Sequence, residues 1–407
     1  MKVFLKKWAV HIFFVLILVD IIFFLNQTIK DRGIFEYFGV DYRLWYSTGN
    51  IIRYKGIGSI YNFDLQGFFQ KQVFDTYSIR SNQSMEFWPL PLPYLSIFAL
   101  PMIVLSYVKP LDGFLIWTIL HILISVLYLL LFIRRLHLNI RMYYLVIIFI
   151  SLPFFLNFLF AQVNLLLLIA TGEFIVNYKK GKEEIAGICL AGLLLKPQNL
   201  LLVIPGLIYL RKWKILKGLT LAGLLILLVS LLLVGHDGIL GLINTILNWP
   251  SQLGDSGMNL LAFSTNLDKV VPQFISKIII ICFYILLLFN IGKNWVDYKN
   301  GKNPFDFIAL LFCTFLITFA ISPHANIYMA MLIIPFGLVL FSNQWLSSKL
   351  SFYWLFVPIT LFLITSWISP GLAHAVAGMA MLFVNILLAS QMINTKQGAS
   401  LINDNYR

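Results

Sequence analysis

Long apolar runs separated by short polar connections make up almost all of this chain. The first run extends from Trp8 to Gln27, and others follow with little interruption as far as Gln391. Most are near the length of about 20 residues that crosses the hydrocarbon core of a membrane. Every backbone amide in lipid needs a partner within the chain, so these runs are predicted to be helices. The pattern therefore predicts an all-α, polytopic membrane protein.

The basic connections between the runs give the helices a direction. Lysine and arginine gather near the amino end and in the short connections 134–141, 178–184, 211–217, 293–302 and 347–349. Because short loops rich in these residues stay in the cytoplasm, we predict that the amino terminus and these connections are cytoplasmic. That assignment requires about twelve transmembrane helices, at about residues 8–28, 112–133, 142–158, 162–177, 184–195, 198–210, 216–234, 274–292, 305–321, 325–342, 350–368 and 370–390.

One apolar segment does not fit the series. Residues 88–105, "WPLPLPYLSIFALPMIVL", are short and carry four prolines, which interrupt helices. We predict an interfacial or re-entrant segment. If it crossed the membrane instead, the basic connection 134–141 would move to the outside, against the charge pattern.

Two predicted outward connections are long, at about residues 29–88 and 235–273. The first mixes charged, glycine and aromatic residues in a way that is typical of short amphipathic helices on a membrane surface. No strong internal repeat divides the chain, and we expect one transmembrane domain over residues 1–407.

Composition agrees with this class and narrows the possible functions. Hydrophobic residues make up 60% of the 407 residues and charged residues 12%, against about 25% in soluble domains. The net charge of +13 is explained by topology, so we expect no nucleic-acid partner. The three cysteines occur singly, as packing residues do. The sequence has no phosphate-binding glycine loop, HExxH or nucleophile elbow, which argues against nucleotide chemistry on a soluble domain.

The polar residues that topology does not explain follow a pattern of their own. They lie in five connections that should face the same side, and such a gathering is how a pocket between helix ends is built. The residues are Asp41, Gln162, Asn164, Lys196, Gln198, His236, Asp237, Ser322 and His324.

Lys196 carries the most information among them. It lies between two runs of only about 12 or 13 residues, or about 18 to 20 Å of helix, which is less than the hydrocarbon thickness. An ammonium group at such a depth usually faces a wet cavity, where it would suit an anionic head group. The alternative is a lysine that extends to the membrane surface and marks a helix end.

Asp41 lies in "FGVDYRLWYSTGN", directly after the first helix. A carboxylate shielded by aromatic neighbours can act as a general base toward a hydroxyl group, although a solvated acid beside an aromatic membrane belt is the simpler interpretation. Glu86 and Asp64 are other acids in the same connection. His324 can bind phosphate or cap a helix, and His236 with Asp237 is a weak metal signal. Glu173, inside an apolar run, is consistent with a hydrogen-bonded helix contact.

The order of these motifs resembles glycosyltransferase family 87, membrane enzymes of the GT-C type that include mannosyltransferases dependent on polyprenyl-phosphate-mannose. The family's first-loop pattern is similar to "DYRLWYSTGNIIRYKGIGSIYNFD", and its later motifs are similar to "FWPLPLPYL", "AQVN", "AGICLAGLLLKPQNLLL", "MNLLAF" and "SPHANIYM". The resemblance covers about residues 35–335. Ala161 stands where the family usually has glycine, and Trp88 where it has tyrosine.

The resemblance implies an inverting hexosyltransferase of the plasma membrane, with its active site on the extracytoplasmic side. Its donor would be a sugar, mannose or another hexose, on a polyprenyl phosphate, and its acceptor a glycolipid or glycan. Asp41 would be the general base, and Lys196, with His324 as a second candidate, would bind the donor phosphate. Further pocket residues would be Gln162, Asn164, Gln198, Asn259 and Glu86, with flat faces for a sugar ring from Tyr42, Trp45 and Trp88. No metal or cofactor is implied.

A transporter or flippase for a lipid-linked saccharide is the alternative function. It would also need many helices and polar groups at membrane depth, but interrupted helices and inverted repeats should accompany them. The polar residues of this chain instead gather at one end of the helices, which favours the enzyme.

Overall fold

The computed structural model of the chain describes residues 2–32, 35, 38–77, 87–248, 257–302 and 306–394. Within these ranges it contains seventeen α-helices, five 3₁₀-helices and no strand, which confirms the all-α prediction. The elements are α1 (Lys2–Arg32), α2 (Val40–Lys55), η1 (Ile57–Ser59), α3 (Phe63–Tyr77), α4 (Ser96–Ala99), η2 (Leu100–Tyr107), α5 (Pro110–Arg135), α6 (Met142–Ile150), α7 (Leu152–Leu159), α8 (Leu165–Lys179), α9 (Glu183–Leu190), η3 (Ala191–Leu195), η4 (Pro197–Leu200), α10 (Val203–Tyr209), α11 (Trp213–Asn248), α12 (Leu260–Leu267), α13 (Gln273–Lys299), α14 (Phe307–Ile321), η5 (Ile327–Ile333), α15 (Ile334–Ser342), α16 (Ser348–Ser366) and α17 (Pro370–Asn394).

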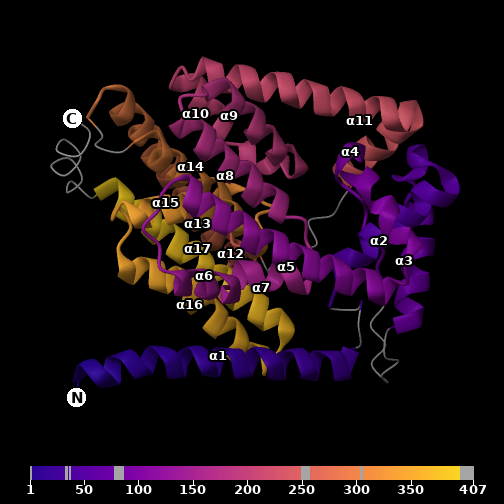
Figure 1. Cartoon of the computed structure of the whole chain (residues 1–407), viewed down its shortest axis with the longest axis horizontal. Helices are drawn as coiled ribbons and strands as arrows, with labels where there is room; N and C mark the ends of the chain where they lie inside the picture. Colours follow the sequence, from indigo (N-terminus) through magenta and orange to yellow (C-terminus); the bar gives the residue numbers. More distant parts are fainter. Residues whose placement is uncertain are drawn as a thin grey trace.

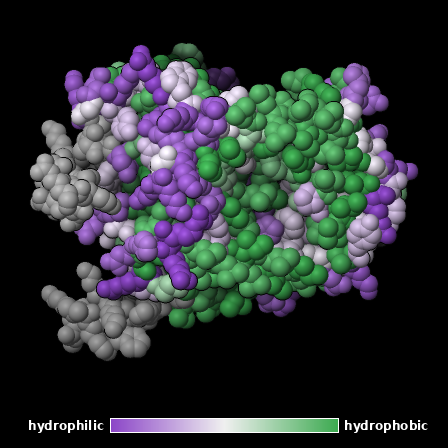
Figure 2. Space-filling view, turned by 45° about the horizontal axis from the view of Figure 1, so that its top comes forward, coloured by the Kyte–Doolittle hydropathy of each residue, from purple (hydrophilic) through white to green (hydrophobic). Residues whose placement is uncertain are grey.

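The helices form an elongated bundle with polar ends. The long helices α1 and α11 run along its two edges, and α2, α3 and α4 gather at the end opposite the amino terminus (Figure 1). Figure 2 shows a broad hydrophobic zone between two more hydrophilic ends. This is the surface expected of helices that lie in lipid with their ends in water.

Five helices in the described part of the chain are long and apolar enough to cross a membrane, namely α5, α11, α13, α16 and α17. The pair α6 and α7, bent by 55° relative to each other, would make a sixth span. Other predicted spans correspond to shorter apolar helices, such as Phe307–Ile321. The total of about twelve spans therefore stays a prediction.

Two stretches of the chain differ from the predicted elements. We expected one helix over 142–158, but it breaks at Ser151, because Pro153 offers no amide proton to a continuing helix and its ring would clash with the preceding turn. The predicted helix 216–234 ends where α11 is kinked, at Gly235, which has φ of 66° and ψ of −170°. The outer connection expected from residue 235 does not begin as a loop, because a second helical part of α11 runs from this kink to Asn248. The sequence after this glycine is still apolar at helical spacing, and it packs against the region of Tyr61.

The proline-rich segment 88–105 has no regular structure in its first half and then forms α4 and η2. The helical part, Ser96–Tyr107, is shorter than a membrane span. The Ser96 hydroxyl donates to the Ser230 carbonyl of α11 at 2.7 Å, which fixes the segment against that helix. Its interfacial or re-entrant position remains a prediction.

Small residues allow close helix contacts at two places in the bundle. A Cβ atom added to Gly49 of α2 would lie 2.2 Å from the Met102 carbonyl oxygen of η2. Added to Gly187 of α9, it would lie 2.0 Å from a backbone oxygen of α11. These glycines let backbones approach as they do in membrane helix pairs.

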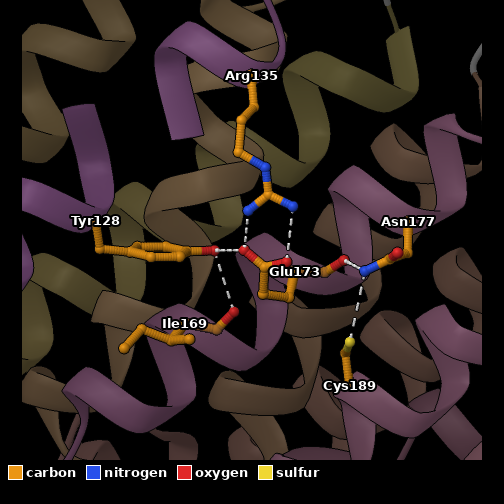
Figure 3. Close-up of polar contacts among 6 residues, drawn as sticks. All are labelled: Tyr128, Arg135, Ile169, Glu173, Asn177 and Cys189. Atoms are coloured by element: carbon orange, nitrogen blue, oxygen red, sulfur yellow. Dashed lines mark hydrogen bonds and ion pairs between the residues drawn. The ribbon is translucent and has the colours of Figure 1, made fainter. Parts of the chain in front are cut away.

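A polar contact joins α5 to α8 at the end of the bundle away from α2. Figure 3 shows the Glu173 carboxylate, which accepts hydrogen bonds from the Arg135 guanidinium and from the Tyr128 hydroxyl. The Asn177 amide donates to the Glu173 carbonyl at 2.8 Å. The interpretation of Glu173 as a hydrogen-bonded helix contact is confirmed.

The basic connections lie side by side in space. The Lys212 ammonium is 3.2 Å from the Tyr178 hydroxyl, and Lys217 forms an ion pair with Glu184 at 3.2 Å. The Lys299 ammonium lies 4.5 Å from the ring centre of Tyr209. Connections 178–184, 211–217 and 293–302 thus share one end of the bundle, as the topology requires. Which side of the membrane this end faces is still a prediction.

Candidate active site

The first turn of α2 is attached directly to the end of α7. The Gly39 amide donates to the Leu159 carbonyl at 2.7 Å, and the Asp41 amide donates to the Phe160 carbonyl at 3.2 Å. Gly39 has φ of 61°, a left-handed conformation that glycine adopts without strain. This turn places the Asp41 carboxylate beside the "AQVN" connection that follows α7.

Gln162 in that connection bonds to both charged groups of the site. Its side chain is 2% exposed. The amide nitrogen Nε2 donates to Asp41 Oδ2, and the amide oxygen Oε1 accepts from Lys196 Nζ at 3.0 Å. Only this orientation of the amide satisfies a carboxylate on one side and an ammonium on the other. The preceding residue, Ala161, has φ of 57°, which explains the glycine that the family pattern usually has there.

Lys196 occupies the break between η3 and η4. Its φ and ψ of −137° and 80° are not helical, because the residue before a proline is excluded from the helical region. The side chain is only 5% exposed, and its ammonium lies 4.6 Å from the ring centre of Tyr328. The Tyr328 hydroxyl accepts a hydrogen bond from Asn326 at 2.7 Å. A buried ammonium requires such partners, since its desolvation is otherwise costly.

The environment of Asp41 suits a proton acceptor. Burial raises the pKa of this carboxyl group to about 6, while the Lys196 ammonium, the Gln162 hydrogen bond and the Arg43 guanidinium oppose that rise. A general base works best when its pKa is close to the working pH. With this pKa the carboxylate is ionised at neutral pH and retains a useful affinity for a proton.

Three of the amides predicted for the pocket have different surroundings. Asn164 is buried and donates to the Asn157 side chain at 3.0 Å. Asn259 caps α12 by accepting from the Ala262 amide at 2.8 Å. It also donates to two carbonyls of the "SPHAN" turn and so holds this turn in place. Gln198 is half-buried, with a weak contact to a methionine sulfur.

His324 is exposed in the "SPHAN" turn. Among the described residues it is not joined by a hydrogen bond to Asp41 or Lys196, so its predicted phosphate contact is still untested. His236 and Asp237 are exposed beside each other on α11, and no third metal-ligating side chain joins them in the part of the chain that the structure describes.

The predicted aromatic platforms are mostly packed away. Tyr42 is fully buried, and Trp45 is 1% exposed with its ring centre 4.8 Å from that of Tyr94. Neither presents a face to a sugar in this structure, so packing, the alternative interpretation, describes both. Trp88 is exposed, and its carbonyl accepts from Arg43 at 2.9 Å. Glu86 lies outside the described residues.

Two residues near Lys196 did not stand out in the sequence. Tyr328 packs on Lys196, and its signal was an aromatic residue one turn after the "SPH" motif. Asn199 is 1% exposed, and within the described structure neither atom of its side-chain amide has a hydrogen-bond partner. Its backbone amide donates to the Lys196 carbonyl at 3.1 Å, so it lies within one turn of that lysine. Buried polar groups are rarely unpaired, so Asn199 is a candidate to contact substrate or water.

The comparisons with known proteins give one match. The sequence model of glycosyltransferase family 87 matches residues 94–323, which is more than half of the 407-residue chain. The matched range contains Gln162, Lys196 and Asn259, whereas Asp41 precedes it. Neither a curated protein nor a solved structure matches the chain. With its apolar helices and this match, the chain belongs to glycosyltransferase family 87 and is a membrane glycosyltransferase.

Proposed function

We propose that the chain transfers a hexose from a polyprenyl-phosphate-linked donor to a glycolipid or glycan acceptor, with inversion at the anomeric carbon. The observation that carries the proposal is the bonded series Asp41, Gln162 and Lys196, which joins a carboxylate to an ammonium at one end of the bundle. The Asp41 carboxylate suits an acceptor hydroxyl, and the Lys196 ammonium suits a phosphate.

Asp41 is the general base of the proposed reaction. The acceptor hydroxyl oxygen attacks the anomeric carbon, and its proton passes to the Asp41 carboxylate. The bond between the anomeric carbon and the phosphate oxygen breaks, and polyprenyl phosphate leaves with the bonding electrons. Attack on the face opposite to the leaving group inverts the configuration.

Lys196 stabilises the leaving phosphate. Negative charge grows on that group as the glycosidic bond breaks, and a positioned cation at low dielectric stabilises it strongly. The lysine ammonium has three donors, and the structure assigns one of them to Gln162. Within the described structure the other two have no hydrogen-bond acceptor, so they can donate to a phosphate, and the ammonium also lies 4.6 Å from the ring centre of Tyr328.

Gln162 separates the Asp41 carboxylate from the Lys196 ammonium, so that each can bind a substrate group. No ion pair within 4 Å joins Asp41 to Lys196 among the contacts of the described residues, because the amide lies between them. A direct salt bridge would compete with both substrates. The interposed amide stabilises the carboxylate and the ammonium and leaves each able to accept a partner.

The sidedness and the donor class belong to the same proposal. The site lies at the end of the bundle away from the basic connections, and the charge pattern supports an extracytoplasmic site on the plasma membrane. Nucleotide sugars are absent there, so a donor carried by a membrane lipid is required. Transport of a lipid-linked saccharide, the alternative, has less support, because the family is one of transferases and the polar groups gather at one end.

The test is sugar transfer by membranes that contain the full chain. Radiolabelled polyprenyl-phosphate-mannose and polyprenyl-phosphate-glucose are supplied as donors, and label is followed into extracted lipids and glycans. Asp41→Asn should abolish transfer without loss of expression, whereas Asp75→Asn, the same change at an exposed position of α3, should not. Undiminished transfer by Asp41→Asn would remove this residue from the base role. Movement of the unsplit donor across sealed vesicles, without transfer, would favour a transporter.

A further inference from the structure

An apolar cavity lies between α6, α15 and α16 and does not include any residue of the proposed active site. Its volume is about 310 Å³, which is at the lower end of the range for ligand pockets. The lining is almost wholly aliphatic and aromatic, with Ile147, Phe341 and Leu355 among the residues that form it. Its size and lining suit a hydrocarbon chain rather than a sugar.

Residues in or beside two basic connections, 134–141 and 347–349, line one part of the cavity. Ile140 and Tyr143 line one side of it, and Ser348 lines the other. The Asn139 amide donates to the Ser342 hydroxyl at 3.0 Å, which holds the two connections together. This part of the lining therefore lies at the end of the bundle where the basic residues gather, opposite to Asp41.

The charged residues in the two chain segments that contribute this part of the lining are basic. Arg141 and Lys349 are exposed next to lining residues, and neither 134–145 nor 342–354 contains an aspartate or glutamate. Two helices, α6 and α16, also begin here, and their first amides carry partial positive charge. Within the described structure, the hydroxyl of Ser351, a lining residue, has no hydrogen-bond partner. These basic residues and helix starts would complement an anionic group.

We propose that this cavity binds an anionic glycerophospholipid of the membrane leaflet on the basic side. One acyl chain fills the apolar cavity, and the phosphate head group lies against Arg141, Lys349 and the start of α16. A soluble anion would leave the apolar lining empty, and a zwitterionic lipid would gain less from the two cations. The anionic surface of the cytoplasmic leaflet supplies a ligand of this kind.

The position of the cavity separates it from the donor site. The proposed donor phosphate binds at Lys196, at the other end of the helices, so the lipid is a second, non-reacting ligand. By filling the space between α6, α15 and α16 it would stabilise their packing. Because its binding is measured without transfer activity, the outcome is independent of the proposed reaction.

Native mass spectrometry of the purified full chain in detergent tests the proposal. Phosphatidylglycerol and phosphatidylcholine of the same acyl composition are added in equal amounts, and bound lipid is counted. We expect phosphatidylglycerol to be retained preferentially. The change of Arg141 and Lys349 to glutamine should reduce that preference by about fivefold for each cation.

A second variant tests the cavity itself. Gly337 of α15 lines it, and a Cβ atom added there meets nothing within 4 Å, so Gly337→Leu should fill the space without disturbing the fold. It should weaken retention of phosphatidylglycerol, whereas Gly292→Leu on α13, where the added atom also meets nothing, should not. Equal retention by wild type and Gly337→Leu would overturn the proposal. Displacement of phosphatidylglycerol by equimolar polyprenyl phosphate would also overturn it, since the cavity would then hold a carrier tail.

Discussion

Replacement of Gln162 by leucine is the sharpest test of the proposed site. The change keeps a side chain of similar size and removes the amide that joins Asp41 to Lys196. A general base is active when ionised, so kcat/KM should fall as the pH drops through the Asp41 pKa of about 6. Loss of a donor to the carboxylate favours its protonated form, so the pKa rises and the fall in activity begins at a higher pH.

The size of the shift follows from the hydrogen bond that is lost. A hydrogen bond to a charged group contributes about 1.5 to 3 kcal/mol, and 1.36 kcal/mol corresponds to one pH unit. The lower value applies, because the Lys196 ammonium and the Arg43 guanidinium still stabilise the ionised carboxylate when the amide is absent. We expect the pH of half-maximal kcat/KM to rise by about one unit in Gln162→Leu.

The assay is the initial rate of transfer from limiting radiolabelled donor over a series of pH values. Gln273→Leu, the same change at an exposed position at the start of α13, is the control and should leave the profile in place. An unchanged profile in Gln162→Leu would contradict the role of the amide. A shift to lower pH would show instead that Asp41 and Lys196 form a direct ion pair once the amide is removed.

Three further predictions test the packing and backbone around the site and the topology of the chain. Gly49→Ala should lower the stability of the purified protein by about 1 to 3 kcal/mol in thermal unfolding, because the added Cβ meets a backbone carbonyl of η2, whereas Gly292→Ala should not. Ala161→Val should reduce both stability and transfer, since a β-branched residue resists the left-handed conformation, while Ala161→Gly should retain both. With the native cysteines replaced, Lys55→Cys and Asn139→Cys, both exposed, should react with impermeant thiol reagents from opposite sides of the membrane. Labelling from the same side would contradict the helix count.

The sequence predicted the class of fold well because lipid imposes a strong local rule. Each apolar run must satisfy its own backbone, so it becomes a helix whatever surrounds it. Boundaries were less predictable. The break at Ser151 depends on a single nearby proline, and the helical part of α11 after the kink at Gly235 packs against a distant segment near Tyr61.

Three members of the candidate site were named from the sequence, but the contacts between them were not predictable. Polar groups beside apolar runs are costly in a membrane and are usually functional, which is why Asp41, Gln162 and Lys196 stand out in the sequence. Tyr328 and Asn199 did not stand out, since a tyrosine or asparagine in such a run is usually a packing residue. Trp45 was expected to expose a face, but its burial against Tyr94 follows from tertiary contacts.

The sequence by itself determined that this protein is a bundle of membrane helices, with the polar groups that topology does not explain near the helix ends. It could do so because the length of the apolar runs and the charge of the loops act locally along the chain. Only the tertiary structure decided which of those groups meet. A hydrogen bond between Asp41 and Gln162 spans 121 positions of sequence, and it exists because α2 is attached to the end of α7. Such contacts depend on how helices pack in three dimensions, which the order of residues in each helix does not specify.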